Sequence, residues 1–324
     1  MGLTNFKNGI TSFGNAVGPS YGGGIGNVYY VCQSASTVMY DHMRKKYGKA
    51  RYDDNSPMLH LTIAAALAYT VSEREDYVIV CSDSSDYDNL ASLSMAARNS
   101  HLICPGGLGS NGMGMNACRL DAGSAITAVS IAADCCEVAG FFIRGFLNST
   151  SDIYMSGTRW HTNIHDNYVG MSASSAGGST YGIYGPATNH MSIHHNMITN
   201  YSPAAVTGTN NAIGAMIITA GTRGIVADNI VHTGPNTTVA VGISFANTGG
   251  YCVRNYVGED PVVSGGIADV GSLTLGISST GSSFMIDNRI NITGANKANA
   301  VSGGTTDASY ICNYNSSSGG SLST

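Results

Sequence analysis

A short pattern of apolar and polar positions recurs along the second half of the chain. IHDNYVG reads as an apolar residue, two polar residues, an asparagine and two larger residues, and IHHNMITN repeats it. Later copies are IVADNIV, YCVRNYV, FMIDNRI and, degraded, YICNYN. The asparagines of the six copies are Asn167, Asn196, Asn229, Asn255, Asn288 and Asn313. Their intervals of 29, 33, 26, 33 and 25 residues indicate a solenoid whose units stack on one another.

The positions around each asparagine predict short strands that meet at a corner. The residue three before the asparagine and the residue two after it are apolar in most copies, as Ile164 and Val169 are around Asn167. Asparagine tolerates the left-handed backbone that a sharp bend requires, and its amide can bond the amide one turn away. We therefore expect a column of stacked asparagines and parallel strands about 4.8 Å apart around a core of Val and Ile.

These features predict an all-β fold, a parallel β-helix. Leucine-rich, ankyrin and tetratricopeptide repeats are excluded, because their signatures and helical segments are missing. DYVIVCSD, SHLICPGG and CCEVAGFFIRGF fit as earlier, less regular coils, with Gly140 at the place of an asparagine. The β-helix is predicted to span residues 76–315 in about eight coils, as one domain.

The ends of a solenoid expose its core unless they are capped. NSPMLHLTIAAALAYTVS predicts a capping helix, with Ser56 as N-cap and Pro57 at the first helical position. We therefore divide the rest of the chain into an extended arm over 1–27, an N-terminal strand and capping helix over 28–75, and a flexible tail over 316–324.

The composition supports a packed β protein and excludes some partners. Charged residues are 11% of the chain, against about 25% in soluble domains, while hydrophobic residues are 43%. A net charge of −5 gives no reason to expect nucleic-acid or membrane binding, and we see no apolar run typical of a signal peptide or a membrane span. The eight cysteines lack CxxC spacing, so we expect reduced, buried thiols and no metal or disulfide framework.

The N-terminal part of the chain resembles a known superfamily. A YYV strand, a DDNSP turn, the helix TIAAALAY, DYVIVCSD and HLICPGG follow one another as in the opening coils of pectin-lyase-like right-handed β-helices, among which phage virion proteins are numerous. LTNFKNGITSFG resembles the arm of tailed-phage β-helix proteins that decorate or cement the capsid. The resemblance implies a right-handed parallel β-helix with a short N-terminal capping helix and an extended N-terminal arm.

The resemblance also implies a function. It implies a homotrimer on the outside of a phage capsid, which binds the major capsid protein and holds neighbouring subunits together, without a cofactor and without enzymatic activity. The protein would assemble in the host cytoplasm. The apolar anchors of the arm are Phe6, Ile10 and Phe13. Further capsid contacts are expected in the basic segment DHMRKKYGKAR, at Arg44, Lys45 and Lys46. A solvated charge run is the alternative interpretation of that segment.

Other side chains suggest alternatives that the residues leave open. The residues that precede the ladder asparagines are Asp166, His195, Asp228, Arg254, Asp287 and Cys312. A structural ladder explains them, because acidic and basic groups alternate from rung to rung. A glycosidase would instead pair Asp166 with Asp228, two rungs or about 9.6 Å apart. The GHG and RIK sequences of polygalacturonase-type β-helices do not occur.

The histidines and tyrosines raise similar alternatives. His161 and His190, like His165 and His194, are 29 residues apart and are expected to stack on adjacent rungs, without a third metal ligand in register. SDSSDYD is expected to be a polar loop and not a calcium site. A tailspike, a polysaccharide depolymerase or a non-catalytic adhesin would need aromatic platforms. The candidates are Tyr154, Trp160, Tyr181 and Tyr184.

Overall fold

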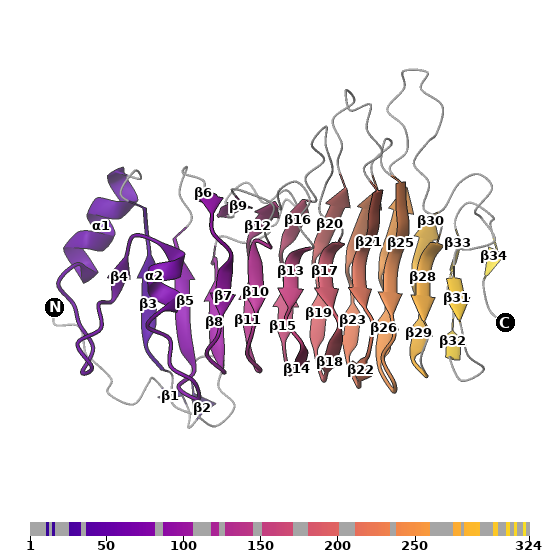
Figure 1. The fold of residues 1–324 in the computed structure, drawn as a ribbon, viewed down its shortest axis with the longest axis horizontal. Coiled ribbons are helices and arrows are strands. Elements are labelled where there is room, and N and C mark those ends of the chain that lie inside the picture. The colour runs from indigo at the N-terminus through magenta and orange to yellow at the C-terminus, as the bar shows by residue number, and fades with distance from the viewer. Residues whose placement is uncertain are drawn as a thin grey trace, which may run out of the picture.

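Successive turns of the chain lie side by side in four sheets, in which every neighbouring pair is parallel except the last pair at the C-terminal end. The computed structural model describes residues 11–12, 15–16, 26–33, 37–81, 87–105, 118–122, 127–144, 151–170, 181–200, 211–233, 238–259, 275–279, 282–291, 301–303, 309–311, 314–315 and 320–321. Figure 1 shows the strands stacked along the longest axis of the molecule, in chain order from one end to the other. The fold is an all-β parallel β-helix, as the repeat predicts.

Sheets 1 and 4 form part of the wall of the rod. Sheet 1 has eight strands. They are β7 (Leu93–Met95), β10 (Val129–Ile131), β13 (Ser151–Met155), β17 (Tyr181–Gly185), β21 (Asn211–Ile218), β25 (Thr238–Phe245), β28 (Leu275–Ser279) and β31 (Val301–Gly303). Sheet 4 has three strands. They are β14 (Thr158–Trp160), β18 (Ala187–Asn189) and β22 (Gly221–Thr222).

Sheet 2 is the longest and has eleven strands. In spatial order they are β4 (Leu59–His60), β3 (Val28–Val31), β5 (Asp76–Val80), β8 (Ser100–Ile103), β11 (Glu137–Ala139), β15 (Asn163–His165), β19 (Ser192–His194), β23 (Ile225–Ala227), β26 (Tyr251–Val253), β29 (Phe284–Ile286) and β32 (Ser309–Ile311). The nine strands from β5 to β32 bound eight turns of the chain, the number that the repeat predicts.

Sheet 3 completes the coil and has ten strands. They are β6 (Tyr87–Leu90), β9 (Arg119–Ala122), β12 (Phe142–Arg144), β16 (Tyr168–Gly170), β20 (Met197–Asn200), β24 (Ile230–Thr233), β27 (Tyr256–Glu259), β30 (Arg289–Asn291), β33 (Tyr314–Asn315) and β34 (Gly320–Ser321). A complete coil passes through all four sheets in turn, as the chain does from β13 to β16.

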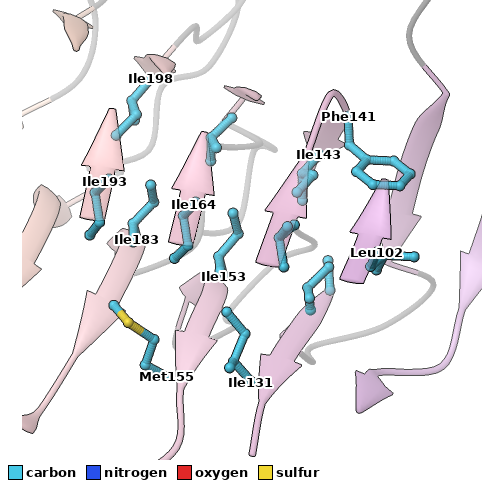
Figure 2. Close-up of a cluster of buried hydrophobic side chains, with 14 of the residues drawn as sticks. Leu102, Ile131, Phe141, Ile143, Ile153, Met155, Ile164, Ile183, Ile193 and Ile198 are labelled. Atoms are coloured by element: carbon cyan, nitrogen blue, oxygen red, sulfur yellow. The ribbon is translucent and has the colours of Figure 1, made fainter. Parts of the chain in front are cut away.

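The core is a set of apolar columns inside the coil. In sheet 2, Ile164 lies in register with Ile193, which lies in register with Val226, and all three are fully buried. Figure 2 shows Ile164, Ile193 and Ile198 with Ile153 and Ile183 in one interior cluster. Burying such a side chain contributes about 1.5–3 kcal/mol, so stacked aliphatic residues stabilise every rung against its neighbours.

The asparagine column is present in sequence order along the corner between sheets 2 and 3. The side-chain Nδ2 of Asn167 donates to Oδ1 of Asn196 at 3.1 Å. The contacts from Asn196 to Asn229, from Asn229 to Asn255 and from Asn255 to Asn288 are each 3.0 Å. All five side chains are buried. The sixth predicted member, Asn313, lies outside the described residues.

The left-handed residue at this corner is not the asparagine, as the sequence led us to expect, but the residue before it. Positive φ angles of 52–56° occur at Asp166, His195, Asp228, Arg254 and Asp287. The bend there turns each asparagine inward, where Nδ2 also donates to a backbone carbonyl of the preceding coil. Gly140, with φ of 82°, therefore matches Asp166, and the buried Phe141 takes the asparagine position.

The N-terminal cap differs from its prediction. A five-residue helix, α2 (Ile63–Leu67), does cover the first coil with Ile63, Ala66 and Leu67, but its N-cap is Thr62 and not Ser56. Ser56 instead bonds the Asp54 carboxylate within a turn, and the residues after Pro57 form strand β4 beside β3. The helix starts later than predicted because strand pairing takes the preceding residues.

Two other N-terminal elements differ from the expectation. An eleven-residue helix, α1 (Thr37–Tyr47), contains most of the basic segment, which the apolar pattern did not reveal. Within the arm, β1 (Thr11–Ser12) pairs antiparallel with β2 (Asn15–Ala16), so the arm is not extended throughout.

Candidate functional site

The predicted basic contacts lie on the last turn of α1, at the N-terminal end of the rod (Figure 1). Arg44, Lys45 and Lys46 are exposed. Arg44 lies 3.5 Å from Asp41 in an exposed ion pair, which contributes little and leaves the guanidinium accessible. The Lys46 ammonium lies 4.9 Å from the centre of the Tyr47 ring. Cations at a helix C-terminus also stabilise the helix dipole, by about 0.3–1 kcal/mol each.

An apolar cleft of about 250 Å³ separates α1 from the outer face of sheet 2. The rings of Tyr30 on β3 and Tyr47 on α1 stack at its edge, with centres 4.4 Å apart. Met39, Met43 and Ile79 are among the residues that line it. Met39 and its neighbour Val38 are exposed. The predicted apolar anchors of the arm, Phe6, Ile10 and Phe13, lie outside the described residues.

A ladder of imidazoles and carboxylates follows the outer face of sheet 2 in the first half of the rod. His101 contacts Glu75 through Nε2 at 3.0 Å and Glu137 through Nδ1 at 2.6 Å. The other oxygen of Glu137 accepts from Nε2 of His165 at 2.7 Å. His165 in turn contacts Asp166 through Nδ1 at 2.7 Å. We call these five residues the imidazole–carboxylate ladder; sequence reasoning missed it, because Glu137 lies in register with His101 but bonds His165, two positions beyond its register partner Asn163.

Pairing sets the charge state of the ladder. Burial alone would raise the pKa of Glu137, but the hydrogen bonds from His101 and His165 outweigh burial and lower this pKa to about 2. Burial lowers the pKa of His101, yet the bonds to Glu137 and Glu75 raise it above the ordinary value. The pKa of His165 is raised in the same way by Glu137 and Asp166, against the effect of burial. The side chains of His101, Glu137 and His165 are less than one fifth exposed, so the network is poorly screened.

The histidines expected to stack on adjacent rungs do so. The rings of His165 and His194 are 4.9 Å apart and parallel within 4°. His194 also meets His195, with the two Nδ1 atoms 2.8 Å apart, so one of these atoms must accept while the other donates. Burial, followed by the charges of His165 and His195, lowers the pKa of His194.

The residues before the ladder asparagines alternate as the sequence suggests, with one difference. Arg254 donates two hydrogen bonds to Asp228 on the next rung, at 2.7 and 2.6 Å, and these lower the pKa of Asp228. Asp166 bonds His165 of its own coil, although the alternation predicted a partner one rung away. Cys312 lies outside the described residues.

The aromatic candidates fall into two separate groups. Tyr154, Tyr181 and Tyr184 stack on the outside of sheet 1, with Tyr184 centred 5.7 Å from Tyr154 and 4.6 Å from Tyr181. Trp160 lies on sheet 4 and stacks on His190 at 5.7 Å. His190 and His161 are 5.0 Å apart, as their spacing predicts. The four aromatics thus do not form one platform.

The remaining candidates concern metals, thiols and membranes. Among the described residues, no group of three or more His, Cys, Asp or Glu side chains could hold a metal ion. Asp83 and Asp86 of the weighed calcium loop are not described. Cys32, Cys104, Cys118, Cys136 and Cys252 are buried, and burial raises the pKa of Cys252 to about 12. No helix among the described residues is both long and apolar enough to span a membrane.

No protein-family model matches the sequence, and no curated protein sequence matches it.

Proposed function

We propose that this chain is a structural virion protein, which binds the outside of a phage capsid as a homotrimer and cements neighbouring major capsid subunits. The observation that carries the proposal is the exposed basic turn of α1 at the N-terminal end of the rod (Figure 1). Docking by charge and docking by an arm would then act at the same end. The fold and the order of its opening elements support the resemblance to pectin-lyase-like phage proteins.

Two carboxylates of the outer surface, Glu137 and Asp228, suit a structural role. A glycosidase needs one carboxyl group whose pKa is raised, so that it can protonate the leaving group. The pKa of Glu137 is instead about 2, and that of Asp228 is also lowered by its partner Arg254. Both carboxylates are ionised at neutral pH and engaged in hydrogen bonds, which suits a rigid rod better than proton transfer.

The proposed mechanism is thermodynamic linkage. A protein that binds the assembled lattice but not free capsid subunits stabilises the lattice by mass action. Three arms per trimer increase the avidity, because one bound arm holds the others at high effective concentration. The basic turn steers the approach to an acidic shell and raises the association rate.

Deletion of residues 1–20 tests the arm. The truncated chain is expected to fold and to keep its oligomeric state, yet to lose cosedimentation with bare capsid shells. Circular dichroism and analytical ultracentrifugation check the first point, and pelleting with shells checks the second. Undiminished capsid binding by the truncated chain would refute the role of the arm.

Charge reversal tests the basic turn separately. Replacing Arg44, Lys45 and Lys46 by Glu is expected to weaken shell binding at least about tenfold at low salt, through a slower association rate. The control reverses Arg223 and Arg289, which are also exposed but lie on the coils, and it is compared with reversal of Lys45 and Lys46 alone, so that the net charge changes equally. Equal losses in the two variants would show that net charge, and not this turn, governs binding.

Glycan binding is the second candidate, and the tyrosine stack on sheet 1 favours it. Aromatic rings at successive rungs can carry sugar rings, as a depolymerase or a non-catalytic adhesin would need. Incubation with host surface glycans distinguishes these alternatives: new reducing ends or unsaturated sugars indicate a depolymerase, and binding without cleavage indicates an adhesin. A Tyr154→Ala and Tyr184→Ala double variant should then lose binding.

A further inference from the structure

Three consecutive strands of sheet 2 are apolar on both faces. β23, β26 and β29 read IVA, YCV and FMI, and their central residues Val226, Cys252 and Met285 are fully buried inside the coil. The preceding strands β15 and β19 read NIH and SIH, with polar residues on the outer face. Continuous apolar strands are typical of sheets that are covered on both sides.

The outer residues of these strands form one patch. Ile225, Tyr251 and Phe284 lie in register on adjacent strands and are 42%, 44% and 36% exposed. The rings of Tyr251 and Phe284 stack with centres 5.1 Å apart and planes 18° apart. A second column beside them completes what we call the apolar face. Its residues are Ala227, which is buried, and Val253 and Ile286, which are half-buried.

We propose that the apolar face is a contact surface between copies of this chain. The proposal builds on the oligomer proposed above and names the surface that holds it together. Contiguous exposed apolar patches mark interaction sites on soluble proteins. Packing of the three rods with this part of sheet 2 turned towards a common axis would cover the patch on each of them.

Charge favours a second copy over other occupants. None of the six residues of the apolar face carries a charge, whereas the whole chain carries −5. Copies therefore repel each other least where these faces meet, and a charged partner would have to bury unpaired groups there. At the border of the face, Asp228 already has its counter-charge in Arg254, and it needs none from a partner.

The length of sheet 2 suits the same occupant. Its nine rungs from β5 to β32, spaced about 4.8 Å apart, run about 38 Å along the rod, and the apolar face occupies three of them. The polar outer residues of β15 and β19 continue the same side of the sheet, so a second rod aligned with this one would meet an apolar centre with polar residues beside it, as stable interfaces do. The apolar face then acts as the anchor of a longer contact.

A matched pair of substitutions tests the proposal on the full-length chain. Ile225 and Ile230 belong to the same coil and are 42% and 41% exposed, but they lie on opposite sides of the asparagine corner. Ile225→Glu is expected to raise the dissociation constant for self-association at least about tenfold. Ile230→Glu should leave it within about twofold. Sedimentation velocity over a concentration series measures both constants, and circular dichroism verifies the fold.

Removal of aromatic rings gives a second test that adds no charge. The double variant Tyr251→Ser and Phe284→Ser should dissociate towards the 33.4 kDa monomer. The control Tyr154→Ser and Tyr184→Ser removes an equally stacked pair from sheet 1 and should remain associated. A monomeric wild-type protein, or equal effects within either pair of variants, would overturn the proposal. Binding to capsid shells is measured separately. A protein that self-associates but does not bind shells would refute the proposed capsid function, while the proposed contact surface between copies would stand.

Discussion

The N-terminal cap and the middle coils are held together in different ways. In the cap, the buried carboxylate of Asp76 accepts three hydrogen bonds. They come from the backbone N–H of Asn27 at 2.8 Å, the backbone N–H of Val71 at 2.7 Å and Nε of Arg74 at 2.7 Å. In the middle coils, the same amide contact recurs once per turn from Asn167 to Asn288. The solenoid interior therefore repeats one polar interaction at equal sites, whereas at its end several different contacts surround one carboxylate.

This difference follows from the position of each region. A middle coil has a neighbour on both sides, so every inward asparagine finds a donor and an acceptor one rung away. The first coil has a neighbouring coil on one side only, so the polar groups on its other side need hydrogen-bond partners from within the cap. Arg74 provides such bonds, because it also donates to the hydroxyl of Tyr29 at 2.7 Å, to the carbonyl of Tyr69 at 3.1 Å and to the carboxylate of Asp54 at 2.9 Å.

The largest effect is expected when the carboxylate of the cap is removed. Asp76→Ala leaves two backbone donors and part of a guanidinium without their acceptor, which costs about 3–5 kcal/mol locally. Because rungs are coupled mainly to their neighbours, the cap should open while the middle coils stay folded. Hydrogen exchange should show lost protection at Val31 and retained protection at Val226.

The control for the cap is Glu73→Ala, which removes an exposed partner of Arg98. Exposed pairs are worth about 0–1 kcal/mol, so protection of β3 should hardly change. If Asp76→Ala instead melted all coils together, the cap and the coils would form one cooperative unit, and the comparison between them would fail.

A somewhat smaller effect is expected from the middle of the ladder. Asn229→Ala removes the acceptor of the Asn196 backbone and side chain and a donor to Asn255, at a cost of about 2–4 kcal/mol. Asn189→Ala is the matched control, since its Oδ1 accepts from Thr222 near the surface at 2.9 Å and its loss costs below about 1 kcal/mol. Urea unfolding measures both values; equal losses would mean that burial in the ladder adds nothing.

The repeat predicted the coils but not the cap, for a physical reason. A period of about 29 residues requires only that each turn present the same apolar positions, and Ile164, Ile193 and Val226 show this in the sequence alone. The cap has no repeat. Its helix start was misassigned at Ser56, because the sequence does not reveal that Leu59 and His60 pair with β3.

The outer surface was only partly predictable, because the sequence reveals only those contacts whose residues recur at the same position of each turn. Histidines 29 residues apart were expected to stack, and His165 does stack on His194. Glu137 was missed, because it joins His101 and His165 across rungs from a coil that carries Gly140 and Phe141 in place of the usual corner. The apolar face was not predicted, because only the register shows that Tyr251 stacks on Phe284.

The smallest effect is a dependence on pH that the imidazole–carboxylate ladder gives to the first coils. The lowered pKa of Glu137 stabilises the fold above the ordinary glutamate value near 4.5, and this stabilisation is lost as the pH falls through about 2. The raised pKa values of His101 and His165 stabilise the fold below about pH 6.5, and this contribution is lost as the pH rises through the folded values. The ladder is therefore most stabilising between about pH 4.5 and 6.5.

Glu137→Gln should flatten this dependence, because both histidines lose their shared anion. Between about pH 5.5 and 8.5 the wild type should lose about 1 kcal/mol more unfolding free energy than the variant does. Tyr77, which stacks on His101, stays neutral there, since burial raises its pKa to about 12. His194, whose pKa is lowered, opposes the trend by losing stability as the pH falls, and it does so in both proteins. Urea unfolding at the two pH values measures the difference, and Glu73→Gln, at an exposed residue, is the control. Parallel pH profiles of the unfolding free energy for wild type and Glu137→Gln would show that the ladder carries no pH-dependent charge pairing.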